Sequence, residues 1–187
     1  MTGQPLIAVR ELSVSYHAGG QATQAVNALS FTLHQGETVA IVGESGSGKS
    51  TLANALLGLL PGSARIDKGR LWVEGIDMAR ASERQKRQLR GRTIGLVPQD
   101  PMVSLNPTLR IGQQIAEALT LTQGRRYPGV DADVLQLLTQ VGLDNPALRA
   151  RQYPHELSGG MRQRVLIAIA LAGNPRLSLI HISEPTR

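Results

Sequence analysis

The sequence contains no cysteine and very few aromatic residues. Its 187 residues include one tryptophan, one phenylalanine and three tyrosines, so aromatic side chains make up 3% of the chain. The absence of cysteine excludes disulfides and every metal site that uses thiolate ligands. Because aromatic residues are so rare, we consider a ligand-binding role as well as core packing for a ring near a functional motif.

Long apolar runs are absent as well. No stretch approaches the roughly 20 apolar residues that a membrane-spanning helix requires, and the longest run, residues 165–172, predicts a buried helix. Residues 1–5 show no basic region followed by an apolar core, so we expect no secretory signal. With 41% hydrophobic and 18% charged residues, the chain is expected to fold as one domain or slightly more.

The net charge of +6 raises the question of nucleic-acid or lipid binding. Much of this charge comes from scattered arginines and from one cluster between Arg80 and Arg92. The cluster includes Glu83 and alternates like the solvated face of a helix. We therefore predict an exposed helix there and no nucleic-acid partner.

The most informative stretch is a glycine-rich loop at residues 43–51. It fits the pattern of glycine, four residues, glycine, lysine, then serine or threonine. A β-branched apolar run at residues 38–42 predicts a strand before the loop, and residues 52–60 predict a helix after it. The loop therefore has the strand-loop-helix context of a phosphate-binding motif.

Each part of this loop has a physical role. The glycines let backbone N–H groups point at phosphate oxygens, and the following helix adds the positive end of its dipole. Lys49 is expected to reach the β and γ phosphates of a nucleotide, and the Ser50 hydroxyl to bind Mg²⁺. The alternative is a glycine-rich cap that binds nothing, which the lysine, the serine and both flanking elements disfavour.

Two strands are predicted upstream, over residues 6–16 and 26–34, because apolar and polar side chains alternate in both. Tyr16 ends the first of them. An aromatic residue at the end of a strand is usually part of the core. Its position upstream of a phosphate loop gives it a second candidate role, since its ring can stack on a nucleotide base.

Gln99 is another candidate ligand. Residues 69–73 and 93–98 predict short strands, and Pro98 and Pro101 exclude a helix around Gln99. The glutamine is therefore expected where a strand passes into a loop, a position from which a side chain can face a ligand. The alternative is an ordinary surface amide.

From residue 108 to residue 148 the pattern changes to amphipathic helices, which predicts a helical insertion in an α/β core. A second motif follows, in which Ser158, Gly159 and Gly160 come directly before a strongly apolar helix. Such a helix start leaves N–H groups and a hydroxyl available for a second anion. Alone it predicts only a well-capped helix.

With these motifs in this order, residues 6–177 resemble the ATP-binding subunit of ATP-binding cassette (ABC) transporters. Within the family, residues 100–107 and 153–157 resemble the branch that serves importers of di- and oligopeptides, nickel or glutathione. The resemblance implies an α/β fold: a P-loop NTPase (RecA-like) core with N-terminal antiparallel strands and a helical insertion, incomplete at the C-terminus. The parts expected are residues 1–100 of the core, a helical subdomain at 101–157, a signature helix at 158–177 and a non-native tail at 178–187.

The resemblance also implies roles for individual residues. Tyr16 is expected to stack on adenine, Gln99 and Ser50 to bind the metal, and Ser158, Gly159 and Gly160 to contact the ATP held by a partner subunit. The remaining cofactor-binding residues are those of the Walker A loop: Gly43, Glu44, Ser45, Gly46, Ser47, Gly48, Lys49, Ser50 and Thr51.

As a family member, the protein is expected to bind ATP and Mg²⁺ and to energise an importer. The partners implied are a second ATPase subunit, identical or sister, transmembrane permease subunits and, indirectly, an extracytoplasmic solute-binding protein. Two nucleotides would be held between the Walker A loop of one subunit and the signature motif of the other. The expected location is peripheral, on the cytoplasmic face of the inner membrane.

The C-terminal tail departs from the family pattern. An apolar strand ending in aspartate and glutamate is expected after the signature helix, yet His181 and Ile182 occupy those positions when no gap is allowed. Slipping the alignment places Glu184 under the family glutamate, with Ser183 in place of the aspartate. We therefore assign no catalytic residue in this chain and expect it not to hydrolyse ATP at a useful rate.

The tail has a simple hypothetical origin. Residues 177–187 match, residue by residue, a translation of the transposase adapter used in sequencing libraries, whose DNA reads CTGTCTCTTATACACATCT followed by CCGAGCCCACGAGA. We expect the genuine protein to continue differently from about residue 177. Two other interpretations remain open at this stage: a non-catalytic nucleotide-binding fragment and a soluble ABC ATPase that acts on nucleic acid.

Overall fold

The computed structural model describes residues 4–127 and 129–180 of the chain. The chain divides into two compact units, Met1–Leu89 and Arg90–Arg187. Both units contain strands as well as helices, so the predicted α/β class is confirmed.

The first unit is built on a four-stranded antiparallel sheet in the order β2-β1-β3-β4. Its strands are β1 (Ile7–Ala18), β2 (Gln21–Leu33), β3 (Ala64–Val73) and β4 (Ile76–Asp77). All the upstream strands expected from alternation are present and run somewhat longer than predicted. Two glycines with positive φ, Gly19 and Gly20, make the turn between β1 and β2.

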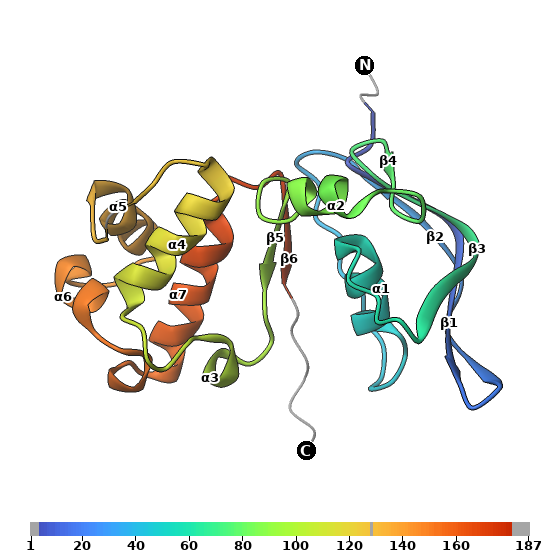
Figure 1. The fold of residues 1–187 in the computed structure, drawn as a ribbon, viewed down its shortest axis with the longest axis horizontal. Helices are drawn as coiled ribbons and strands as arrows, with labels where there is room; N and C mark the ends of the chain where they lie inside the picture. The colour runs from blue at the N-terminus through green and yellow to red at the C-terminus, as the bar shows by residue number, and fades with distance from the viewer. Residues whose placement is uncertain (1–3, 128, 181–187) are drawn as a thin grey trace. The chain divides into compact units, whose positions relative to one another are not determined.

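One helix, α1 (Lys49–Leu57), lies beside this sheet (Figure 1). It buries Leu52, Ala55, Leu56 and Leu57, and the strands contribute buried side chains from alternate positions, among them Val9, Leu71 and Val73. The helix ends at Gly58, whose φ of +64° lets its N–H reach back to the helix carbonyls.

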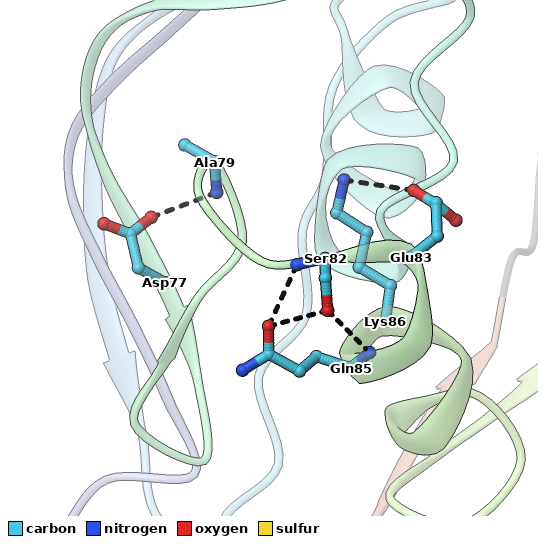
Figure 2. Close-up of polar contacts among 6 residues, drawn as sticks. All are labelled: Asp77, Ala79, Ser82, Glu83, Gln85 and Lys86. Atoms are coloured by element: carbon cyan, nitrogen blue, oxygen red, sulfur yellow. Dashed lines mark hydrogen bonds and ion pairs between the residues drawn. The ribbon is translucent and has the colours of Figure 1, made fainter.

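A short helix, α2 (Glu83–Leu89), carries part of the basic cluster. Figure 2 shows how it begins: the Ser82 hydroxyl accepts a hydrogen bond from the Gln85 N–H at 3.3 Å, and the Gln85 amide oxygen accepts one from the Ser82 N–H at 2.9 Å. Lys86 pairs with Glu83 at 3.3 Å and is only 19% exposed. A Cβ on Gly58 would lie 2.7 Å from the Lys86 side chain, so this lysine covers the end of α1.

The second unit is mainly helical. A parallel pair of strands, β5 (Ile94–Val97) and β6 (Leu177–Ile180), accompanies a bundle of helices. The helices are α3 (Pro101–Ser104), α4 (Ile111–Gln123), α5 (Ala132–Gln140), α6 (Pro146–Arg151), the 3₁₀ turn η1 (Pro154–Glu156) and α7 (Gly159–Leu171). The α-helices other than α3 share one apolar core, in which Ile111, Ile115, Leu138 and Val165 are fully enclosed.

The strand expected at residues 38–42 does not form. This stretch has no regular secondary structure, and Val39, Ile41 and Val42 are 46%, 46% and 89% exposed. A strand is held by hydrogen bonds to its neighbours, and the four-stranded sheet ends at β2 and β4 without including this stretch. An apolar, β-branched run therefore forms a strand only where a neighbouring strand is available to pair with it.

Candidate functional site

The phosphate-loop motif lies directly before α1. Gly46 and Gly48 have φ values of +82° and +91°, the left-handed conformation that favours glycine. A Cβ at Gly48 would lie 2.1 Å from the carbonyl oxygen of Ala25, so a larger residue there would displace the chain. The backbone path of the loop thus depends on Gly48 for two reasons. The residue has a positive φ, and it lies too close to Ala25 to carry a side chain.

The Lys49 side chain folds back over this loop. Its Nζ donates hydrogen bonds to the carbonyl oxygens of Gly43 at 2.5 Å and Glu44 at 2.6 Å, and lies 3.3 Å from the Ser47 hydroxyl. These acceptors hold the ammonium group against the backbone of the loop. A phosphate group could replace them as the partner of the lysine, because it carries a full charge and carbonyl oxygens do not.

The start of α1 is suited to an anion. Gly48 provides no side-chain cap, and the first turn contains no acidic residue. The first N–H groups of the helix therefore keep their positive potential toward the loop. Ser50 is exposed in this first turn, and Thr51, the next residue, is buried.

Tyr16 lies next to the same helix. Its hydroxyl is 3.3 Å from Oγ1 of Thr51, and either atom can be the donor. The ring is half-buried and therefore not fully enclosed in the core. The structure thus brings Tyr16 to the phosphate loop; its stacking on a base stays a prediction.

A polar cluster flanks Tyr16 on the sheet. Asp67 lies 3.2 Å from Nε of Arg65 and 3.4 Å from Nε2 of His17. A hydrogen bond from Ser15 lowers the pKa of the Asp67 carboxyl below its ordinary value, and Arg65 and His17 act in the same direction against the opposing effect of burial. This cluster ties the end of β1 to β3.

Gln99 follows β5 in a bend, as the flanking prolines predict, and its side chain is exposed. It belongs to the second unit, whereas the phosphate loop belongs to the first. Asp100 caps the next helix by accepting a hydrogen bond from the Met102 N–H at 2.7 Å. This helix, α3, was not predicted, although an aspartate followed by proline is a typical helix start.

α3 presents apolar side chains to solvent. Met102 is 63% exposed and Val103 is 80% exposed. These two exposed apolar side chains are a candidate contact surface. The helix is too short for apolar periodicity to predict it.

The signature motif begins α7. The Ser158 hydroxyl accepts a hydrogen bond from the Met161 N–H at 3.3 Å, as expected for an N-cap. Gly159 and Gly160 are exposed, and a Cβ on either would meet nothing within 4 Å. The start of α7 is therefore open to an approaching group, while Val165 and Ala168 anchor the helix in the core.

Several sequence-based assignments lie outside the described residues. His181, Ile182, Ser183 and Glu184 belong to the part of the tail that the structure does not describe. Within residues 4–127 and 129–180, no group of three or more acidic, histidine or cysteine side chains is placed to hold a metal ion. In the same ranges no helix combines the length and apolar character needed to cross a bilayer.

Comparisons with known proteins indicate one family. The ABC transporter family matches residues 26–187. The chain is 49% identical over 184 residues to a peptidoglycan transport ATP-binding protein of Agrobacterium fabrum, covering 98% of this chain and 33% of that protein. It is 43% identical over 184 residues to a dipeptide transport ATP-binding protein of Bacillus subtilis, covering 98% of this chain and 54% of the relative.

One of the solved structures has a similar fold. The chain is similar, at a TM-score of 0.74 and 27% identity, to a dimeric ATP-binding cassette in a post-hydrolysis state bound to ADP and Pi. That match covers 93% of this chain and 72% of the other. Among the curated relatives, the chain spans only a third to about half of their length.

Proposed function

The chain belongs to the ABC transporter family, and we propose that it is the ATP-binding part of a subunit that energises an importer of di- or oligopeptides or related solutes. The observation that carries this proposal is the presence of two open helix starts on one chain. One follows the phosphate loop at Gly48, and the other follows Ser158. The peptide class is supported by the relatives named as dipeptide and oligopeptide transport ATP-binding proteins.

The two helix starts fit opposite sides of a nucleotide. In a head-to-tail pair, the loop at residues 43–51 of one subunit would cradle the phosphates, and Ser158, Gly159 and Gly160 of the other would close over them. The open space above both glycines supports this arrangement. The second subunit would be an identical or a sister chain.

The residues of the loop fit ATP and Mg²⁺. Lys49 would exchange the carbonyl oxygens of Gly43 and Glu44 for the γ-phosphate, and Tyr16 would stack on adenine. Ser50 and Gln99 would hold Mg²⁺, which neutralises charge on the phosphates when it is bound. These roles follow from the motif positions and from the donor types present.

Coupling to a permease would use the segment after β5. Gln99 is exposed there, and Met102 and Val103 offer an apolar contact on α3. A transmembrane permease contacting this segment would sense the state of the nucleotide site, with a solute-binding protein acting through the permease. We place the subunit peripherally on the cytoplasmic face of the membrane for this reason.

The 187-residue chain itself is proposed to bind ATP without turning it over. Hydrolysis in the family requires a carboxylate pair after the strand that follows the signature helix, and His181 and Ile182 stand at those positions. This favours a second candidate function for the literal chain, that of a non-catalytic nucleotide-binding fragment. No observation favours the nucleic-acid alternative.

Two experiments test the proposal. Amplifying the gene from source DNA and sequencing across the codon for Leu177 should yield an apolar strand ending in aspartate and glutamate in place of the adapter-like tail. The intact protein should then co-purify with a membrane permease and hydrolyse ATP. Co-purification with ribosomes or nucleic acid instead would overturn the importer assignment.

A further inference from the structure

An unusual cluster lies on the exposed side of the first unit's sheet. Arg10 of β1 and Arg70 of β3 are direct partners across the two strands. Their guanidinium carbons lie 5.5 and 5.8 Å from the centre of the Trp72 ring. Both arginines are exposed and the ring is half-buried.

Placing two like charges directly opposite one another weakens a sheet. Stacking on one indole offsets part of this cost, because the face of the ring attracts both cations. In the described part of the chain, neither guanidinium makes a hydrogen bond or an ion pair. The nearest acid by register is Asp77, opposite Trp72, and its carboxylate accepts a hydrogen bond from the Ala79 N–H at 3.0 Å (Figure 2).

The backbone at this place is irregular on both strands. Glu11, next to Arg10, has a φ of +47°, which is rare for a residue other than glycine. Gly69, next to Arg70, has a φ of +79°, and a Cβ there would lie 2.3 Å from the Glu11 carbonyl oxygen. The register shifts directly after Arg10. Irregularities of this kind redirect side chains, and this one lies directly beside both arginines.

We propose that the surface formed by Arg10, Trp72 and Arg70 docks an acidic segment of a partner protein. Guanidinium groups stacked on a ring keep their N–H edges free, and these edges match the two oxygens of a carboxylate. Tryptophan and arginine are also the residues that dominate binding energy at protein interfaces. Nucleic acids and lipid surfaces gain affinity from many cations spread along a surface, whereas this cluster concentrates two on one ring.

The cluster contains its own reporter, because Trp72 is the only tryptophan in the chain. Titrating the 187-residue chain with hexaglutamate at low ionic strength should change the Trp72 fluorescence saturably. Raising the salt concentration should suppress the change, since exposed charges are screened. Hexaglutamine, of the same length without charge, should cause no change.

Variants separate this site from general attraction. The double variant Arg10→Gln/Arg70→Gln should weaken hexaglutamate binding about tenfold or more. Arg84→Gln/Arg87→Gln removes the same charge from α2 and should leave binding within about twofold. Arg10→Lys/Arg70→Lys keeps the charge without the planar fork and should fall between the two. Circular dichroism and thermal unfolding check that each variant is folded.

Three results would overturn the proposal. The first is the absence of any Trp72 response to hexaglutamate. The second is equal loss of binding in the α2 control variant, which would indicate non-specific attraction. The third is a response to vesicles of phosphatidylglycerol but not to the peptide, which would assign the surface to lipid.

Discussion

The hydroxyl of Tyr16 lies 3.3 Å from Oγ1 of Thr51, which connects the last part of β1 to the first turn of α1. Because Thr51 follows Lys49 and Ser50 directly, this contact holds the proposed base-stacking ring beside the proposed phosphate site. The base and the phosphates of a nucleotide would thus be recognised by Tyr16 and by the phosphate loop, which are in contact with each other.

Replacing Tyr16 tests this arrangement. Tyr16→Ala should weaken ATP binding about tenfold, because stacking of a base on an aromatic ring contributes about 1–3 kcal/mol. Tyr16→Phe keeps the ring and loses only the contact to Thr51, so its effect should be much smaller. Binding is measured by calorimetry, with tripolyphosphate as the control. Equal loss of tripolyphosphate binding in Tyr16→Ala would mean that the ring only supports the fold.

Lys49→Ala should abolish most ATP binding. The side chain lies at the mouth of the loop on three oxygen atoms, and a charged hydrogen bond contributes about 1.5–3 kcal/mol. The expected loss is therefore at least about tenfold. Lys68→Ala, which removes an exposed lysine from β3, serves as the control and should bind ATP normally. Unchanged affinity in Lys49→Ala would contradict the proposed role of the phosphate loop in ATP binding.

Ser158 has a structural and a proposed functional role that two substitutions separate. Ser158→Ala removes the cap of α7 and should lower the free energy of unfolding by about 1 kcal/mol. Ser158→Asp keeps a capping oxygen, so stability should be retained. Its negative charge would repel the γ-phosphate, so ATP-dependent dimerisation of the intact protein should be lost. Normal dimerisation of Ser158→Asp, followed by size-exclusion chromatography, would contradict the proposed sandwich.

The cluster around Asp67 predicts a pH effect on stability. Hydrogen bonding lowers the pKa of this carboxyl in the folded state, so its ionised form stabilises the fold above the ordinary aspartate pKa of about 3.9. That contribution is lost as the pH falls through the lower, folded-state pKa. Urea unfolding should show wild type to be more stable than Asp67→Asn at pH 7, with the difference shrinking in acid. A difference that stays the same from neutral to acidic pH would contradict this contribution.

Local signals in the sequence predicted much of the fold. Alternation located the upstream strands, and the helix predicted at residues 52–60 is α1, which runs from Lys49 to Leu57. Ser158 is the cap of α7, as its position before the apolar helix indicates. These predictions succeed because helix caps, glycines and hydrophobic periodicity determine the structure of residues close to them in the sequence.

The failures involve contacts between distant parts of the chain. The stretch at residues 38–42 has strong strand character but no strand beside it in the sheet. Ser13 and Ser15 alternate with apolar residues in β1, yet they are only 5% and 6% exposed. The register of β1 is bulged in this region, and the Ser13 hydroxyl accepts a hydrogen bond from the Ala28 N–H at 3.1 Å. Neither feature is visible in the alternation of one strand.

We propose that this chain has the residues that bind ATP and lacks the carboxylate pair that hydrolyses it. The most direct test is steady-state ATP hydrolysis by the purified 187-residue chain, measured beside ATP binding in the same preparation. We expect binding that depends on Lys49, with no turnover above the Lys49→Ala background. Sustained turnover that disappears in Lys49→Ala would contradict it.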